Sequence, residues 1–175
     1  TKWLVSGLPG AQLVFGRFVA SLIWLLPVIV IYRKQLFTQR WWLHALRGAL
    51  LFIGITLWSC ALGKVQMSMA TVINFTLPFY VLIMARYVLG EKISTARALA
   101  TVTGFVGAVI TMNPFGQSFV LESLLLVFAS LSFASLDIVN KKFVSSEPFW
   151  AMILYSSLFT SLIAAPVAFY QWQPV

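Results

Sequence analysis

Charged residues are scarce in this sequence. Only 9% of its 175 residues are charged, whereas 61% are hydrophobic, and the mean hydropathy is +0.93. A water-soluble domain of this size carries about a quarter of its residues as charges, so the composition excludes that class and indicates a membrane protein. Cysteine is present once, at Cys60 in the middle of an apolar run. A single cysteine excludes a disulfide framework and argues against a thiolate metal cluster.

The residue types that catalytic sites need are also rare. The chain has one histidine and four acidic residues. It contains no HExxH, no GxSxG, no glycine-rich phosphate loop and no pair of carboxylates within an apolar run. Neither a metal site nor a hydrolase triad can be assembled from these residues. We therefore expect no enzyme activity, no metal and no cofactor.

Six long apolar runs fill the chain, and short polar hinges separate them. A bilayer core of about 30 Å requires about 20 mostly apolar helical residues to cross it. The runs are continuous rather than alternating, which favours helices over a β-barrel. The sequence therefore predicts an all-α, polytopic membrane helix bundle, with spans at about 11–32, 46–63, 66–89, 95–113, 119–139 and 148–170.

The net charge of +8 is distributed unevenly between the hinges. Three hinges are basic, whereas the alternate segments contribute only Lys2 and Lys64. By the positive-inside rule the basic hinges lie in the cytoplasm and both chain ends lie outside. The charges form no continuous stripe, so we expect lipid rather than nucleic acid as the partner. The basic hinges hold Arg33, Lys34, Arg40 and Arg47, then Arg86, Lys92 and Arg97, and then Lys141 and Lys142.

Two other hinge features predict structural roles. Trp41, Trp42 and His44 are typical of an interfacial belt. Glu91 and Ser94 indicate an ion pair and an N-cap that open the next helix.

A weak internal repeat indicates inverted topology. A shift of 140 residues aligns AQLVFGRFVASLI (11–23) with AMILYSSLFTSLI (151–163), and a proline follows each segment. The shift carries the first span onto the sixth, an odd step that inverts orientation, as in inverted-repeat transporters. We therefore expect residues 1–114 to be most of a first five-helix repeat that lacks its first helix. Residues 115–175 are then the first two helices of a second repeat in a ten-helix (5+5) fold.

Several segments resemble one transporter family. RGALLFIGIT (47–56), MATVINFTLPF (69–79) and TVTGFVGAVIT (101–111), with the Gly90–Glu91 hinge and Pro114, are similar to the EamA family of the drug/metabolite transporter superfamily. Together with FASLSFASLDIVNKKFV (128–144), they resemble more narrowly the S-adenosylmethionine uptake carriers of obligate intracellular bacteria. The resemblance implies a multi-pass secondary transporter of the bacterial inner membrane that moves a small metabolite. The alternatives are an exporter of amino acids or drugs, or a non-transporting membrane fragment.

One candidate binding face lies in the run 66–89. Thr71, Asn74, Phe75 and Pro78 follow one another at helical spacing. Pro78 has no amide hydrogen to donate to the Asn74 carbonyl, so the helix is discontinuous there. We expect this face to line a water-accessible cavity, since discontinuous helices build transporter sites. The alternative is a structural kink whose polar groups are satisfied by Thr71 or a neighbouring helix.

A second candidate face carries Ser130, Phe133 and Asp137. Asp137 is either an anionic point on the path of a cationic solute or an interfacial ion pair with Lys141 at i+4. If the cargo is S-adenosylmethionine, Trp58 and Phe75 are candidates to hold its sulfonium by cation–π attraction or to stack on its adenine.

Two further features of the spans carry predictions. Arg17 lies about two turns into the first run. It is a candidate gate that snorkels outward, pairs with a carboxylate or meets an anionic group of the cargo. Gly104, Gly107 and Ala108 predict a small-residue seam for close helix packing.

Overall fold

The computed structural model describes residues 10–33, 36–38, 40–112, 121–143 and 146–172. Within these ranges every regular element is a helix. The helices are α2 (Gly10–Ile31), α3 (Trp41–Leu62), α4 (Met67–Asn74), α5 (Leu77–Val88), α6 (Thr95–Met112), α7 (Ser123–Phe143) and α8 (Phe149–Tyr170). The predicted positions Lys2, Lys34 and Pro114 lie outside the described residues.

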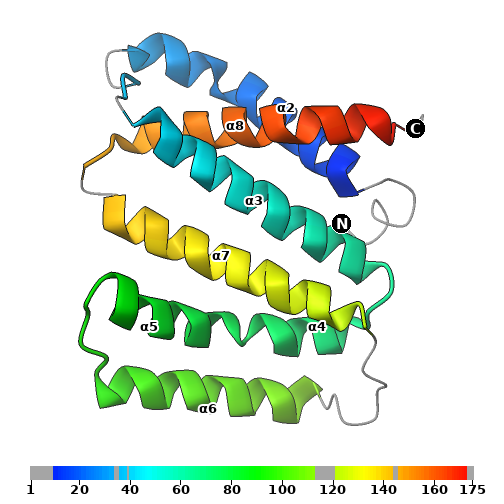
Figure 1. Cartoon of the computed structure of the whole chain (residues 1–175), viewed down its shortest axis with the longest axis vertical. Coiled ribbons are helices and arrows are strands. Elements are labelled where there is room, and N and C mark those ends of the chain that lie inside the picture. The colour runs from blue at the N-terminus through cyan, green and yellow to red at the C-terminus, as the bar shows by residue number, and fades with distance from the viewer. Residues whose placement is uncertain (1–9, 34–35, 39, 113–120, 144–145, 173–175) are drawn as a thin grey trace.

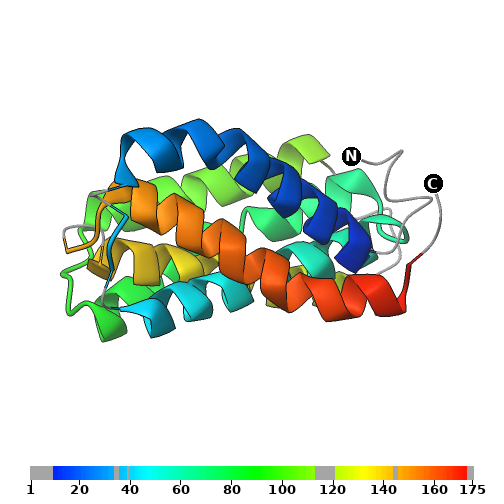
Figure 2. The same cartoon turned by 90° about the horizontal axis from the view of Figure 1, so that it is seen from above.

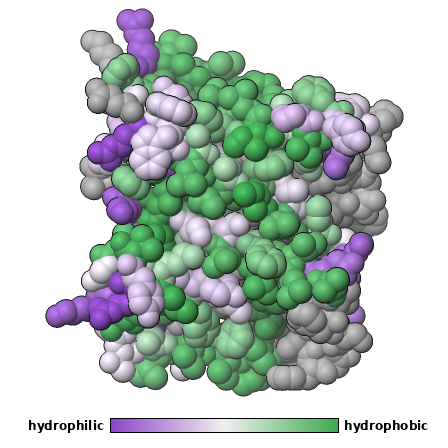
Figure 3. Space-filling view, viewed as in Figure 1, coloured by the Kyte–Doolittle hydropathy of each residue, from purple (hydrophilic) through white to green (hydrophobic). Residues whose placement is uncertain are grey.

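The lengths and composition of these helices suit a membrane. Five segments are long and apolar enough to cross a bilayer, with α4 and α5 together making one of them, and α6 is a shorter apolar helix. Large apolar side chains such as Trp24, Ile110 and Leu162 are exposed along the spans, and apolar surface dominates the face seen in Figure 3. The prediction of an all-α, multi-pass membrane chain is confirmed.

The helices lie side by side, and chain order is not spatial order. Figure 1 shows α7 between α3 and the α4–α5 pair, and both α2 and α3 lie next to α8. The helix ends that flank the three basic hinges lie at one end of the bundle, which we call the basic end (Figure 1). The other end is called the opposite end. The two C-terminal helices are thus packed against the helices of the N-terminal part.

Helix α3 begins earlier than predicted. It starts at Trp41 rather than near residue 46, so its first turn contains Trp41, Trp42 and His44. The two tryptophans are exposed, but His44 is 0% exposed. The assignment of His44 to an interfacial belt was therefore wrong, because its ring lies inside the bundle.

Helix α7 extends beyond its predicted end at residue 139, as far as Phe143. Asp137 therefore lies nearly two turns inside the helix. The predicted ion pair between Asp137 and Lys141 was wrong, because Lys141 Nζ lies 2.7 Å from the Glu91 carboxylate instead. Gly90 makes this possible with a left-handed φ of 68°, after which the Glu91 amide returns to the Ala85 carbonyl at 3.2 Å.

The hinge after α5 has the structural role that the sequence predicted. Arg97 Nη1 lies 3.8 Å from the same Glu91 carboxylate. The Arg97 amide also donates to Ser94 Oγ at 3.3 Å, as an N-cap does. The ion pair and the cap predicted at this hinge are confirmed.

The discontinuity predicted at Pro78 is present as an interruption of the helix at Phe75 and Thr76. Helix α4 ends at Asn74, and α5 begins at Leu77 with the proline in its first turn. Thr76 bridges the break, because its hydroxyl donates to the Ile73 carbonyl and its own carbonyl accepts from the Phe79 amide. Asn74 is therefore the last residue of α4, and its side chain is exposed.

Close packing depends on different glycines from those predicted. A Cβ at Gly48 would lie 2.6 Å from Phe159 Cβ, and one at Gly54 would lie 2.7 Å from the Phe133 ring. These two α3 glycines let α8 and α7 approach. Gly104 and Gly107 have open space where a Cβ would be added, whereas Ala108 is buried. Among the described residues the two glycines of the predicted seam on α6 therefore make no close contact.

Candidate functional site

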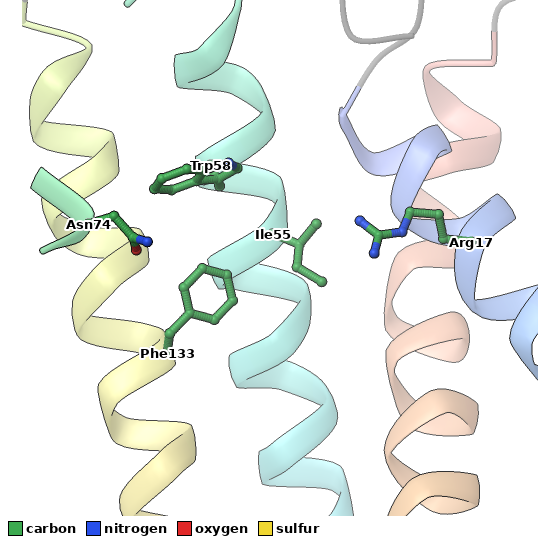
Figure 4. Close-up of a pocket in the computed structure, with 5 residues that line it drawn as sticks. All are labelled: Arg17, Ile55, Trp58, Asn74 and Phe133. Carbon is green, nitrogen blue, oxygen red and sulfur yellow. The ribbon is translucent and has the colours of Figure 1, made fainter. Parts of the chain in front are cut away.

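A pocket of about 360 Å³ lies among four helices. Its lining residues come from α2, α3, α4 and α7 and are Arg17, Ile55, Trp58, Asn74 and Phe133 (Figure 4). The volume is within the range of small-molecule sites. An arginine, an amide and two aromatic rings converge here within spans that otherwise carry few polar groups.

The five side chains divide into two groups. Figure 4 shows the Asn74 amide directed toward the space between the rings of Trp58 and Phe133. Arg17 approaches from α2, and its guanidinium extends toward α3 and Ile55. The pocket therefore has an aromatic and amide side and a cationic side.

The pocket lies in the half of the bundle nearer the opposite end. At 1.5 Å per residue, Arg17 lies about 10 Å along α2 from Gly10, and Asn74 about 10 Å along α4 from Met67. Trp58 is about 6 Å from the end of α3, and Phe133 about 15 Å into α7. All these helix ends are at the opposite end (Figure 1).

Gly54 determines where the aromatic side of the pocket lies. The Phe133 ring occupies the space that a β-carbon at residue 54 would need, with its Cε1 2.7 Å from that point. Ile55, the next residue, lines the pocket. The absence of a side chain on α3 thus lets an α7 aromatic ring reach the cavity wall.

Three of the predicted site residues line this pocket: Arg17, Trp58 and Asn74. They come from three helices that are distant in the sequence. Phe133, which the sequence placed on the face with Ser130 and Asp137, completes the aromatic side.

The other predicted residues lie outside the lining. The Thr71 hydroxyl donates to the Met67 carbonyl at 2.8 Å, so it does not donate to the Asn74 carbonyl. Phe75 and Pro78 are exposed at the break after α4. Ser130 is fully buried, and its hydroxyl has no hydrogen-bond partner among the described residues. Asp137 is exposed one turn beyond Phe133, toward the basic end.

A polar cluster at the basic end was not predicted. It joins α3 to α7, to α8 and to the adjoining loops, and consists of Thr38, Arg40, His44, Arg47, Asn140, Ser146 and Glu147. The Arg47 guanidinium is its centre: Nε donates to Asn140 Oδ1 at 2.7 Å, and Nη1 donates to the Met152 carbonyl at 3.3 Å. Arg47 is only 7% exposed.

The carboxylate of this polar cluster is Glu147. Its Oε2 accepts from Thr38 Oγ1 at 2.9 Å and lies 3.6 Å from His44 Nε2. The His44 ring also stacks on Tyr155, with centroids 5.1 Å apart. Buried charges with several partners cost much to separate. The i, i+3 spacing of His44 and Arg47 could have indicated that their side chains lie on one helix face. The sequence pattern instead placed both residues in a polar hinge at the surface.

The opposite end is joined by a simpler contact. Lys64, after α3, donates to Glu122, before α7, at 2.8 Å. This hydrogen bond lowers the pKa of the Glu122 carboxyl and raises the pKa of the Lys64 ammonium. Because the pair is solvent-exposed, it contributes little to stability.

A second hollow of about 350 Å³ lies between α2 and α8. Its lining is apolar and consists of Val19, Leu22, Ile23, Leu26, Ile29, Leu154, Tyr155 and Leu158. A groove without convergent polar groups does not suit a charged metabolite. The first pocket is therefore the candidate site.

Comparison with known proteins gives a consistent family. The model of the EamA-like transporter family matches residues 1–113. The S-adenosylmethionine uptake transporter of Rickettsia prowazekii is 42% identical over 98% of this chain and 59% of its own length. The transporter of the same name from Rickettsia bellii is 43% identical over 98% of this chain and 60% of its own.

More distant relatives have another cargo in their name. The riboflavin transporter of Vibrio cholerae is 33% identical over 95% of this chain and 57% of its own length. The chain thus spans about three fifths of the length of the curated relatives that it matches. No solved structure gives a significant match to the chain.

Proposed function

The chain belongs to the EamA-like transporter family, and we propose that it forms part of a secondary transporter that takes up or exchanges S-adenosylmethionine across a bacterial inner membrane. The observation that carries the proposal is the pocket formed by Arg17, Trp58, Asn74 and Phe133 inside the spans. The names of the relatives support the cargo. Those relatives are transporters, which favours carriage over catalysis.

The chemistry of the pocket fits this cargo. S-adenosylmethionine has a flat adenine, a sulfonium cation and an amino-acid end. Aromatic faces such as those of Trp58 and Phe133 attract a sulfonium and stack on a base. The Asn74 amide both donates and accepts hydrogen bonds, as recognition of a base edge requires. Asp137 lies one turn beyond Phe133 on α7 and is the carboxylate of that helix that a cationic group of the cargo could approach.

The remaining predicted residues have supporting places in this proposal. Pro78 has no amide hydrogen for the Asn74 carbonyl, and α4 ends at Asn74. The Thr71 hydroxyl bonds back to the Met67 carbonyl within its own helix. Phe75 and Ser130 are close in sequence to the lining residues Asn74 and Phe133 but do not line the pocket themselves. We therefore propose Trp58 and Asn74 as the main residues that contact the substrate.

We propose that the full fold is a ten-helix inverted repeat, with the boundary between residues 114 and 115. The internal match makes α2 and α8 equivalent, and these helices pack together with opposite directions (Figure 1). Helices that a two-fold axis in the membrane plane relates run in opposite directions. Figure 2 shows α2 and α8 running side by side along the bundle. The pocket, lined by α2, α3, α4 and α7, would then belong to both repeats.

Sidedness is tested by labelling introduced cysteines. Lys142 and Lys92 are at the basic end, and Lys64 is at the opposite end. In a Cys60→Ser background, cysteines at 142 and 92 should resist an impermeant maleimide in intact cells, whereas one at 64 should react. Reaction of 142 and 92 on different sides would contradict the inverted-repeat assignment.

Transport itself is tested with the protein from its complete reading frame in proteoliposomes. We expect saturable uptake of labelled S-adenosylmethionine that unlabelled S-adenosylmethionine inhibits. Absence of such flux would remove this cargo. Efflux of amino acids or drugs would support an exporter, and absence of any flux would support a non-transporting fragment.

Riboflavin is the second candidate cargo, because several relatives are named riboflavin transporters. Its flat ring would suit Trp58 and Phe133, but it offers neither a cation nor a carboxylate to the charged groups. Competition in the same assay separates the two. S-adenosylmethionine should inhibit its own uptake at lower concentration than riboflavin does.

A further inference from the structure

Arg17 is the one cationic side chain of the pocket, and nothing in the described residues pairs with it. The chain has four acidic residues. Three of them, Glu91, Glu122 and Glu147, are held in ion pairs at the helix ends. The fourth, Asp137, lies on α7 beyond Phe133 and is not part of the pocket lining.

An unpaired guanidinium at this depth requires an explanation. Arg17 is exposed among the described residues, and a charged side chain at the centre of a membrane span costs about 2.5–3.5 kcal/mol on insertion scales. Arg17 lies about 10 Å from the start of α2. Its guanidinium extends toward α3 and the pocket (Figure 4). An ionisable side chain inside a span is by default a candidate functional group, and a cation that lines a cavity suits an anionic group of a ligand.

The form of the cation specifies the anion. Guanidinium binds a carboxylate through two parallel hydrogen bonds, which an ammonium cannot do. The aromatic and amide groups occupy the other side of the pocket, so a ligand that spans it has a flat ring at one end and a carboxylate at the other.

We propose that Arg17 binds the α-carboxylate of an amino-acid nucleoside, with the nucleobase held at the side of Trp58, Asn74 and Phe133. The assignment rests on the proposed function and deepens it. It makes Arg17 a specificity-determining residue rather than a gate. The carrier should reject analogues that keep adenine and sulfonium but lack the carboxylate.

The experiment compares S-adenosylmethionine with its decarboxylated analogue in wild type and Arg17→Gln. Both are competed against labelled S-adenosylmethionine in proteoliposomes that contain the complete protein. A hydrogen bond to a charged group corresponds to about 10- to 100-fold in affinity, so wild type should prefer the carboxylate form by that factor. In Arg17→Gln the preference should fall to near one, through weaker binding of S-adenosylmethionine alone.

Two further variants act as controls. Arg33→Gln makes the same change at the basic end of α2, outside the pocket, and should keep the wild-type preference. Arg17→Lys keeps the charge but loses the bidentate geometry, so an intermediate preference is expected. Because each preference is a ratio within one variant, a lower amount of inserted protein does not change it. Arg17→Lys also serves if Arg17→Gln fails to insert.

The outcomes separate the two proposals. If wild type takes up S-adenosylmethionine but Arg17→Gln weakens both analogues equally, Arg17 has a structural or gating role and the assignment is overturned. An unchanged preference in Arg17→Gln overturns it as well. If wild type takes up no S-adenosylmethionine, the proposed function fails and the carboxylate assignment fails with it.

Discussion

Adding one methyl group at Gly54 should close part of the pocket while leaving the fold intact. A β-carbon there would lie 2.7 Å from Phe133 Cε1, whereas ordinary contact begins at 3.4 Å. The ring must therefore retreat by about 0.7 Å or more to reach ordinary van der Waals contact. Phe133 lines the pocket, so the ring is free to move into a space of about 360 Å³. We expect Gly54→Ala to weaken cargo binding about 3- to 10-fold and to cost under about 1 kcal/mol of stability.

Two other glycines provide matched controls for this substitution. At Gly48 the added carbon would lie 2.6 Å from Phe159 Cβ and 2.9 Å from the Thr160 backbone nitrogen. Backbone cannot retreat as a ring can, so Gly48→Ala should destabilise the fold by about 1–3 kcal/mol. At Gly63 nothing lies within 4 Å, so Gly63→Ala should change neither quantity.

The assay combines calorimetric titration of the cargo with thermal unfolding of the purified protein. The expected pattern is lower affinity in Gly54→Ala, a lower melting temperature in Gly48→Ala and wild-type values in Gly63→Ala. Equal affinities of Gly54→Ala and Gly63→Ala would refute the reasoning, because they would show that the Phe133 ring does not border the bound cargo.

Three more predictions concern other parts of the chain. Asn74→Ala and Asp137→Asn should each lower uptake without preventing membrane insertion, and unchanged kinetics in both would return them to structural roles. Arg47→Met should lower stability by about 2 kcal/mol in thermal unfolding, since it leaves polar partners buried and unpaired. The Lys64–Glu122 pair stabilises the opposite end only while both groups are charged. Because the pKa of Glu122 is lowered in the folded state, the stabilisation by the pair is lost as pH falls through the folded-state pKa of Glu122. Because the pKa of Lys64 is raised, the stabilisation is also lost as pH rises through the folded-state pKa of Lys64. The melting temperatures of wild type and Glu122→Gln, measured across pH, should differ by a small amount at neutral pH and converge under acid.

Apolar run length was sufficient to predict most of the fold. The six predicted spans correspond to the helical segments of the structure within a few residues, because bilayer thickness sets helix length. The break at Pro78 was also predictable, since proline lacks the amide hydrogen that a continuous helix needs. The start of α3 was not predictable from polarity. His44 and Arg47 look like hinge residues in the sequence, but other helices surround them with hydrogen-bonding partners.

The candidate site shows why local pattern does not give the neighbours of a residue. Helical spacing placed Ser130 and Phe133 on one face of one helix, but Ser130 is buried while Phe133 lines the pocket. The neighbours of a residue depend on the order of the helices in space. Helix α7 lies between α3 and α4, although α7 begins at Ser123 whereas α3 ends at Leu62 and α4 at Asn74. Likewise, the Asp137–Lys141 pair satisfies the i, i+4 rule, but Lys141 instead reaches Glu91, which the turn at Gly90 brings close. A charge pair within one helix is worth only about 0.3–0.5 kcal/mol, so a partner from another element readily replaces it.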